Sequence, residues 1–292
     1  MQEKKIIFIL ANDVGMKWLS LYALIIFILV CSTAWCEEIH EAVQGGNIEI
    51  VKCLLKEKPV LIHAKDIHGY RPLHRAVMTD QKDMVFYLLR NGADINAKGK
   101  HDITPLYQAV FYGNKQMTEL LIANGASIDG KTDLGWTVLH VSAFSNQVDI
   151  IKILMQRGAE VNVRDLLGYT PLHWAAFAGN KDAVEFLVQN EAEVNAHAKD
   201  GHTSLHWLAY TGYCDIITIL LAKGADINSK TKKGNTPLHL ASLNGQEETV
   251  KLLIEYGADV NLRNNNGYTP LSYALYKGYY AIADLLRSYG AW

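Results

Sequence analysis

The chain has 292 residues, of which 49% are hydrophobic and 10% aromatic, enough apolar surface to form a sizeable core. Its 28 basic and 30 acidic residues give a formal net charge of -2. This balance excludes the overall positive field that draws a protein to nucleic acids or anionic membranes. We therefore expect no nucleic-acid partner, and contact with a membrane only through the N-terminal segment.

The first 36 residues have the pattern of an export signal. A second methionine, Met16, precedes Lys17 and then a run over residues 18–36 without a charged side chain. Small residues near Ala34 offer cleavage sites of the kind that signal peptidase uses. We predict an export signal over residues 1–36, with Met16 as an alternative start of translation.

A retained membrane anchor is the alternative to a cleaved signal. The run over residues 18–36 is just long enough to cross a hydrocarbon core of roughly 30 Å. Lys17 precedes the run and Glu37 and Glu38 follow it, a charge order that directs the rest of the chain out of the cytoplasm. Cleavage is favoured, and both alternatives predict an extracytoplasmic location: periplasmic, secreted or membrane-anchored.

A repeat of 33 residues organises the rest of the chain. Segments similar to TPLH begin at Arg71, Thr104 and then every 33 residues as far as Thr269, without insertion or deletion. Such a period is typical of stacked repeat architectures. A first unit, one residue longer, precedes them. The predicted units of the domain over residues 37–292 are 37–70, 71–103, 104–136, 137–169, 170–202, 203–235, 236–268 and 269–292.

Each unit carries signals for two short helices. In the unit beginning GYTPLHWAAFAGN, Thr170 is suited to cap a helix and Pro171 to occupy its first turn. Gly179 ends this helix, and a second helix begins near Asp182, whose charge suits the positive helix terminus. The positions equivalent to Gly179 hold only residues that tolerate a left-handed turn: Gly46, Asp80, Gly113, Asn146, Gly212, Gly245 and Gly278.

The motifs TPLHWAA, the turn glycine, the LL pair and GADVN, at a period of 33, resemble the ankyrin-repeat family over roughly residues 37–292. The resemblance implies an all-α fold, an ankyrin-repeat solenoid of stacked helix-turn-helix units with projecting β-hairpin loops, whose usual role is binding proteins. Glu191 departs from the pattern because it replaces the glycine before AEVN. A left-handed residue with a side chain costs about 1 kcal/mol there.

The recurrent histidines and the cysteines have a structural interpretation. Neighbouring helices lie roughly 8–10 Å apart, too far for histidines of adjacent units to share a zinc ion at about 2.0 Å. The resemblance instead implies a hydrogen bond between each histidine, the threonine of its own unit and the next loop. We expect Cys53 to be buried and Cys214 to be exposed, without a disulfide between them. The histidines in question are His40, His74, His140, His173, His206 and His239.

No arrangement of nucleophile and base, phosphate-binding loop or paired carboxylates is recognisable, so we predict that the protein is not an enzyme and has no catalytic, metal or cofactor site. The variable positions are more informative. Aromatic residues recur at the end of the first helix of the units and at the loop tips. Rings in such a row are typical anchors of protein interfaces. The predicted partner-binding residues are Phe111, Tyr112, Trp136, Phe144, Tyr169, Trp174, Phe177, Trp207 and Tyr210.

Two interpretations of these rings stay open at the helix ends: exposure for binding, or packing between neighbouring units. The loop tips are expected to be exposed. The predicted function is a non-catalytic protein–protein interaction module, exported or membrane-anchored, that binds a protein partner through its concave face and hairpin tips. The alternative is a secreted effector or toxin-associated ankyrin protein acting on another cell. We also expect self-association through the last unit, where no further unit covers Ala274 and Leu275.

Overall fold

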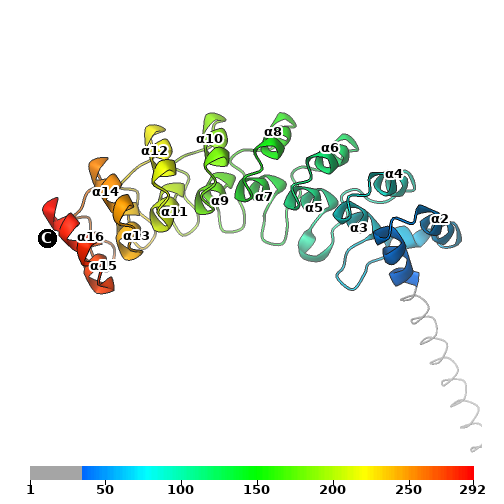
Figure 1. The fold of residues 1–292 in the computed structure, drawn as a ribbon, viewed down its shortest axis with the longest axis horizontal. Coiled ribbons are helices and arrows are strands. Elements are labelled where there is room, and N and C mark those ends of the chain that lie inside the picture. Colours follow the sequence, from blue (N-terminus) through cyan, green and yellow to red (C-terminus); the bar gives the residue numbers. More distant parts are fainter. Residues whose placement is uncertain (1–34) are drawn as a thin grey trace, which may run out of the picture. The chain divides into compact units, whose positions relative to one another are not determined.

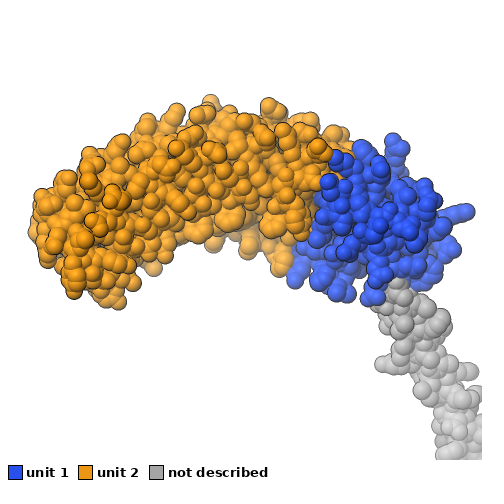
Figure 2. All heavy atoms as spheres, viewed as in Figure 1, with its two compact units in different colours: residues 1–100 blue, residues 101–292 orange. Residues whose placement is uncertain are grey.

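The computed structural model describes residues 35–292, which form helices joined by turns, with no β-strand among them. The all-α class is confirmed, and the loops expected as β-hairpins are turns. The chain divides into two compact units, one ending at Lys100 and the other spanning His101–Trp292 (Figure 2). The predicted export signal lies almost entirely outside the described residues. Within residues 35–292, no helix is long and apolar enough to cross a membrane.

The first compact unit contains two helical pairs. Residues 35–44 are helical and precede α2 (Ile48–Glu57), the short 3-10 helix η1 (Pro59–His63), α3 (Pro72–Met78) and α4 (Lys82–Arg90). Helix α2 buries Val51, Leu54 and Leu55, a spacing that defines one face. Cys53 lies off this face and is exposed, so its predicted burial is wrong.

The second compact unit is a curved stack of helical pairs (Figure 1). The first helices of the pairs contact one another in succession and lie on the inner side of the curve, whereas the second helices lie on the outer side. The 3-10 helix η2 (Lys100–Asp102) precedes them. The pairs are α5 (Pro105–Phe111) and α6 (Lys115–Ala123), α7 (Val138–Phe144) and α8 (Val148–Gln156), α9 (Pro171–Phe177) and α10 (Lys181–Gln189), α11 (Ser204–Thr211) and α12 (Cys214–Ala222), α13 (Pro237–Leu243) and α14 (Glu247–Glu255), and α15 (Pro270–Lys277) and α16 (Tyr280–Ser288).

A threonine and a histidine cap the first helix of most pairs. In α9, the Thr170 backbone N–H donates to His173 Nδ1 over 3.1 Å, and the Thr170 hydroxyl lies 2.8 Å from the same nitrogen. Because Nδ1 accepts, Nε2 carries the proton and donates to the carbonyl of His202 in the next loop over 3.2 Å. The predicted structural role of this histidine is therefore confirmed. The same three-part arrangement recurs at His140, His206 and His239.

These histidines are uncharged at neutral pH. Burial lowers the pKa of His173 to about 4, against hydrogen bonds to backbone that act in the opposite direction. Burial likewise lowers the pKa of His140 and His239 to about 4 and that of His206 to about 3. The scaffold thus holds a ladder of neutral imidazoles.

The turns between paired helices adopt the predicted left-handed conformation. The φ angle is 71° at Gly179, and it is 53° at Asp80 and 55° at Asn146, where a side chain is present. Glu191 has φ 67° at a position that glycine occupies in other repeats. The prediction that Glu191 is strained is confirmed in its backbone geometry.

An asparagine joins each of several loops to the following repeat. Asn195 Nδ2 donates to the Gly224 carbonyl over 2.8 Å, and its Oδ1 accepts from the Asp226 N–H over 2.8 Å. Asn162 makes the same two bonds, to Glu191 and Glu193. This asparagine clamp, which also includes Asn261, uses the last residue of the GADVN motif. In each clamp, the asparagine side chain of one repeat makes hydrogen bonds with a carbonyl and an N–H group of the backbone turn in the next repeat.

The last helical pair differs in part from the expectation. Leu275 is 39% exposed, as predicted, but Ala274 is fully buried. Ala274 belongs to α15, which packs against both α13 and α16, and a small side chain on such a helix is covered by these neighbours. The expectation that Ala274 is uncovered is therefore wrong.

Candidate binding surface

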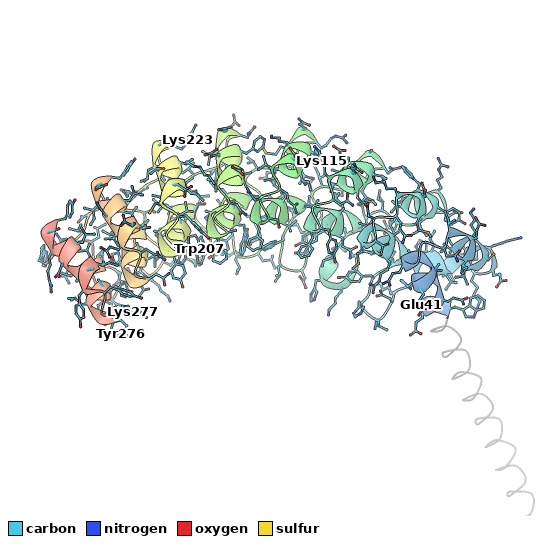
Figure 3. The ribbon with its side chains drawn as sticks, viewed as in Figure 1. Glu41, Lys115, Trp207, Lys223, Tyr276 and Lys277 are labelled. Atoms are coloured by element: carbon cyan, nitrogen blue, oxygen red, sulfur yellow. The ribbon has the colours of Figure 1, made fainter. Side chains whose placement is uncertain are left out.

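The predicted helix-end aromatics lie at corresponding positions of consecutive repeats in the second compact unit. Phe144, Phe177 and Tyr210 are 38–39% exposed and stand at or near the ends of α7, α9 and α11. A 33-residue period places one such ring on each repeat. Figure 3 shows Trp207 on the α11 side of the stack, opposite Lys223 at the end of α12. The rings therefore belong to the inner side of the stack, which the first helices form.

These rings are joined by the half-buried tryptophans into a continuous surface. Trp136 contacts Phe144 and Trp174, with ring centroids 5.9 and 4.5 Å apart, and Trp174 contacts Phe177 at 6.1 Å. Trp207 then contacts Phe177 at 5.1 Å and Tyr210 at 6.2 Å. Both open interpretations hold at once, because the helix-end rings pack against neighbours and keep more than a third of their surface exposed. We name this surface the aromatic strip: Trp136, Phe144, Tyr169, Trp174, Phe177, Trp207 and Tyr210.

Tyr169 is the predicted binding residue whose position differs most from the expectation. It is only 7% exposed, although it lies at a loop tip. Its ring lies 5.5 Å from Trp174 and 6.0 Å from Trp207, and its hydroxyl donates to Asp200 Oδ2 over 2.6 Å. The rings of Trp174 and Trp207 cover Tyr169, which its own loop would leave exposed to solvent. Burial, together with the Asp200 carboxylate, raises the pKa of Tyr169.

The other loop tips follow the prediction more closely. Leu134, Leu166 and Leu167 are exposed at their tips, whereas Trp136 is half-buried.

Phe111 and Tyr112, at the end of α5, are 57% and 58% exposed, and the centroids of their rings lie 5.4 Å apart. Neither ring takes part in the contacts of the aromatic strip. The structure therefore brings seven of the nine predicted residues together and places Phe111 and Tyr112 apart.

A cavity of about 260 Å³ opens within the strip between α9 and α11. Rings form most of its wall, and both nitrogens of His173, which also lines the cavity, are hydrogen-bonded to the scaffold. Six residues line it: Leu167, Tyr169, His173, Trp174, Phe177 and Trp207.

Two aspartates behind these rings were not predicted. Asp165 Oδ2 accepts the Trp174 indole N–H over 3.0 Å, while its Oδ1 accepts from the backbone N–H groups of Leu167 and Tyr169. Asp200 accepts from the Tyr169 hydroxyl and from the His202 N–H. For Asp165, the recurrence of Asp or Asn four residues before the tip tyrosine, as at Asp66 and Asn264, is the signal that was available in the sequence; Asp200 lies outside this pattern.

The titratable groups of the described residues offer no metal site. Within residues 35–292, no group of three or more His, Cys, Asp or Glu side chains is arranged to hold a metal ion. The cysteines described are free; Cys214 is half-buried rather than exposed, with its Sγ 3.3 Å from Thr249 Oγ1.

Comparison with protein families places this surface in context. A family model described as ankyrin repeats, three copies, matches residues 33–99, 98–165, 164–231 and 226–291. The chain belongs to the ankyrin-repeat family. Its histidine caps, turn glycines and asparagine clamps are thus features of an ankyrin scaffold, and ankyrin repeats imply a protein–protein interaction module.

Several curated proteins match short parts of the chain. It is 50% identical over 56 residues to human protein phosphatase 1 regulatory subunit 27 (19% of this chain, 36% of that protein). It is 38% identical over 58 residues to alpha-latroinsectotoxin-Lt1a of Latrodectus tredecimguttatus (20% of this chain, 4% of that protein). It is 40% identical over 62 residues to transient receptor potential cation channel subfamily A member 1 of Drosophila melanogaster (20% and 5%). The matched segments span between 4% and 36% of these relatives, so the likeness concerns repeats rather than whole proteins.

Proposed function

We propose that this chain is a non-catalytic interaction module that binds a protein partner through the aromatic strip. The observation that carries the proposal is the continuity of the strip: ring contacts run from Trp136 to Tyr210 across consecutive repeats, while the helix-end rings stay more than a third exposed. Contiguous exposed aromatic surface of this kind is typical of interaction sites.

The exposed part of each ring is large enough to matter for binding. An aromatic side chain buries about 150–250 Å² when fully covered, so covering the exposed part of Phe144, Phe177 or Tyr210 stabilises a complex by roughly 1–2 kcal/mol each at about 25 cal/mol per Å². Their contacts with the tryptophans hold the rings in place before binding. Less conformational entropy is then lost on association.

A non-catalytic role is supported by what the histidines do. His173 and His206 are neutral, buried and hydrogen-bonded through both nitrogens, which leaves neither ring free as a base or ligand. The match to a phosphatase regulatory subunit is consistent with this role, because that relative is named as a subunit that regulates rather than as an enzyme.

The proposal places the module outside the cytoplasm, exported or held by an N-terminal anchor, on the strength of the sequence of residues 1–36. Mass spectrometry of the natural protein's first peptide tests this part. A mature start near Trp35 or Glu37 supports a cleaved signal, and a peptide containing Ala23 to Val30 supports an anchor. A start at either methionine together with recovery of the protein in the cytoplasm would contradict both.

A second candidate function is a secreted effector or toxin-associated protein acting on another cell. The match to alpha-latroinsectotoxin-Lt1a over 58 residues favours it. Recovery of the mature chain from the culture medium supports this alternative, whereas retention in the cell envelope contradicts it.

Self-association through the last repeat is a further part of the proposal. Tyr276, Tyr280 and Trp292 are 69–80% exposed, and Leu275 lies beside Tyr276 in α15. Sedimentation of the full chain should show a concentration-dependent dimer that the double variant Tyr276→Ser, Tyr280→Ser loses. A monomer at all concentrations would contradict it.

The strip is tested by replacing Phe144, Phe177 and Tyr210 together with serine and capturing partners from a native extract. We expect loss of the captured protein with unchanged helical circular dichroism. The matched control replaces Tyr256 and Tyr289, exposed tyrosines at the ends of the outer helices α14 and α16, which should keep capture. Unchanged capture by the strip variant, or equal loss in the control, would overturn the proposal. A melted stack would show that the rings are core residues.

A further inference from the structure

Four rings of the aromatic strip form a closed circuit around the cavity between α9 and α11. The centroids of neighbouring rings are 5.5 Å apart from Tyr169 to Trp174, 6.1 Å from Trp174 to Phe177, 5.1 Å from Phe177 to Trp207 and 6.0 Å from Trp207 back to Tyr169. The planes of these pairs meet at 57–85°. Neighbouring walls of a box meet at such angles, and the cavity is the space that they surround.

The size of the cavity suits one side chain. At about 260 Å³, it lies below the usual range of sites for drug-sized ligands. A group at the centre of a circuit with these spacings lies within about 6 Å of every ring centroid, which is the range in which a cation is attracted to the face of an aromatic ring.

The residues that line the cavity carry no positive charge, and the guanidinium of Arg164 nearby is bound to the Gly168 and His197 carbonyls. None of the six lining residues is a lysine or arginine, and His173 is neutral because it is buried. Behind the rings stand two carboxylates: Asp165 holds the Trp174 indole, and Asp200 holds the Tyr169 hydroxyl. Asp165 is buried and makes no ion pair within the described residues.

The same carboxylates keep the walls in place. His202 stacks on Trp207 at 4.9 Å and 19°, and its Nδ1 lies 2.9 Å from Asp200 Oδ2, although the two atoms are not aligned as a hydrogen bond. Three of the four walls, Tyr169, Trp174 and Trp207, are thus fixed directly or through one neighbour by an aspartate. A preformed cavity binds with less loss of entropy than one that must be assembled.

We propose that this cavity, the aromatic cage, receives the cationic head group of a lysine or arginine side chain of the protein partner. The inference rests on the proposed function and adds the chemistry of the partner's anchor. The ring faces attract the cation, and Asp165 and Asp200 supply the negative charge behind them. A neutral apolar side chain gains only the contact with the rings, so the cage discriminates in favour of a positive charge.

The test is titration of the full chain, labelled with ¹⁵N at tryptophan, while the indole N–H signals of Trp174 and Trp207 are followed by NMR. The probes are the N-acetyl methylamides of arginine, lysine and trimethyllysine, with that of norleucine as the neutral control. We expect at least one cationic probe to shift both signals saturably and to bind at least fivefold more tightly than norleucine. Equal binding of norleucine would show an apolar pocket, and absence of any shift would show a closed one; either result overturns the proposal.

Variants separate charge from shape. Asp200→Asn keeps an oxygen acceptor for the Tyr169 hydroxyl but removes the charge, so binding of the cationic probe should weaken severalfold while norleucine binding is unchanged. Trp207→Leu removes a wall and should abolish binding. Tyr256→Ser is the matched control, because Tyr256 is an exposed tyrosine at the end of α14, outside the strip, and this variant should leave probe binding intact. An unchanged affinity of Asp200→Asn for the cationic probe would overturn the role of the charge.

The two proposals fail differently. Partner capture that depends on the strip but is unaffected by Asp200→Asn, in a chain that binds no cationic probe, would overturn the cage and leave the interaction module standing. Selective probe binding by the cage, with capture unaffected by the triple strip variant, would overturn the proposed module and leave the cage as a site for a cation.

Discussion

The Tyr169 hydroxyl donates a hydrogen bond to Asp200 Oδ2 over 2.6 Å and so ties one loop tip to the next. Removing this hydroxyl in Tyr169→Phe should lower the free energy of unfolding by about 1 kcal/mol, since a bond to a carboxylate is worth more than a neutral one but Asp200 is half-exposed. Denaturation by guanidinium measures the change. Tyr268→Phe, at an exposed tip tyrosine, is the control, and an equal loss in both variants would mean that the bond to Asp200 contributes nothing.

Replacement of Glu191 by glycine should stabilise the stack. The backbone at Glu191 is left-handed, with φ 67°, and its carbonyl remains available to Asn162 after the substitution. Relief of the strain is expected to raise the free energy of unfolding by up to about 1 kcal/mol, reduced by the greater freedom of glycine in the unfolded chain.

The reverse change at the corresponding glycine provides the control. Gly224 has φ 81° and open space where a Cβ would be, so Gly224→Glu introduces the strain without a clash. It should lower the unfolding midpoint by about as much as Glu191→Gly raises it. Shifts of the same sign in the two variants would contradict this account.

The asparagine clamp should be worth more than an ordinary surface amide. Asn195→Ala removes one hydrogen bond to the Gly224 carbonyl and one from the Asp226 N–H, and we expect a loss of about 1–2 kcal/mol. Asn190→Ala removes only a bond to Phe186 within the same helix end and should cost less. Hydrogen exchange at the Asp226 amide should accelerate in the first variant only; unchanged exchange would show that the clamp does not protect it.

The neutral histidines predict a loss of stability in acid. His140, His173, His206 and His239 have a pKa of about 3–4 when folded because they are buried, against about 6.5 in an unfolded chain. Below pH 6.5 the unfolded chain therefore binds more protons, so stability is full above that pH and falls as the pH drops toward 4. Each histidine contributes a slope of about 1.4 kcal/mol per pH unit in this window.

Chemical denaturation between pH 7.5 and pH 5 measures that slope. His173→Gln keeps polar atoms at the cap but removes one titrating group, so the slope should fall by the equivalent of one proton whatever the stability at pH 7.5. An unchanged slope would mean that these imidazoles do not govern the acid sensitivity. The cap formed by Thr269 and Ser272 shows that the scaffold makes the same backbone contact without a titrating group.

The backbone of this fold was largely predictable from sequence because its determinants are local. The left-handed turn at Gly179, and its tolerance of Asp80 and Asn146, follows from which residues accept a positive φ. The cap at His173 follows from the motif TPLH, which is four residues long. By contrast, the exposure of Cys53 depends on which face of α2 packs against the core. Its position next to two leucines in the sequence does not show which face that is.

The binding surface was predictable only as a set of residues. The equivalence of Phe144, Phe177 and Tyr210 follows from the period, but the burial of Tyr169 depends on two tryptophans that belong to different helices. Asp165 and Asp200 were missed because an aspartate in a loop tip has an ordinary turn-forming role, and only the fold shows that each also holds a ring. A periodic sequence pattern therefore does not predict the side-chain contacts between neighbouring repeats.

The asparagine clamp has a consequence for how such a chain tolerates changes in length. Each clamp joins a side chain to backbone atoms at the same position of the following repeat, as at Asn162 and Asn195, and uses no feature peculiar to one repeat. Deletion of any 33 consecutive residues therefore joins two equivalent positions of the repeat, so the clamp can form again across the junction. Deletion of 32 residues shifts the register by one, and the clamp cannot form there. In genetic terms, the stack can be shortened or lengthened by whole repeats, while the identity of the rings lost or gained decides what the remaining surface can bind.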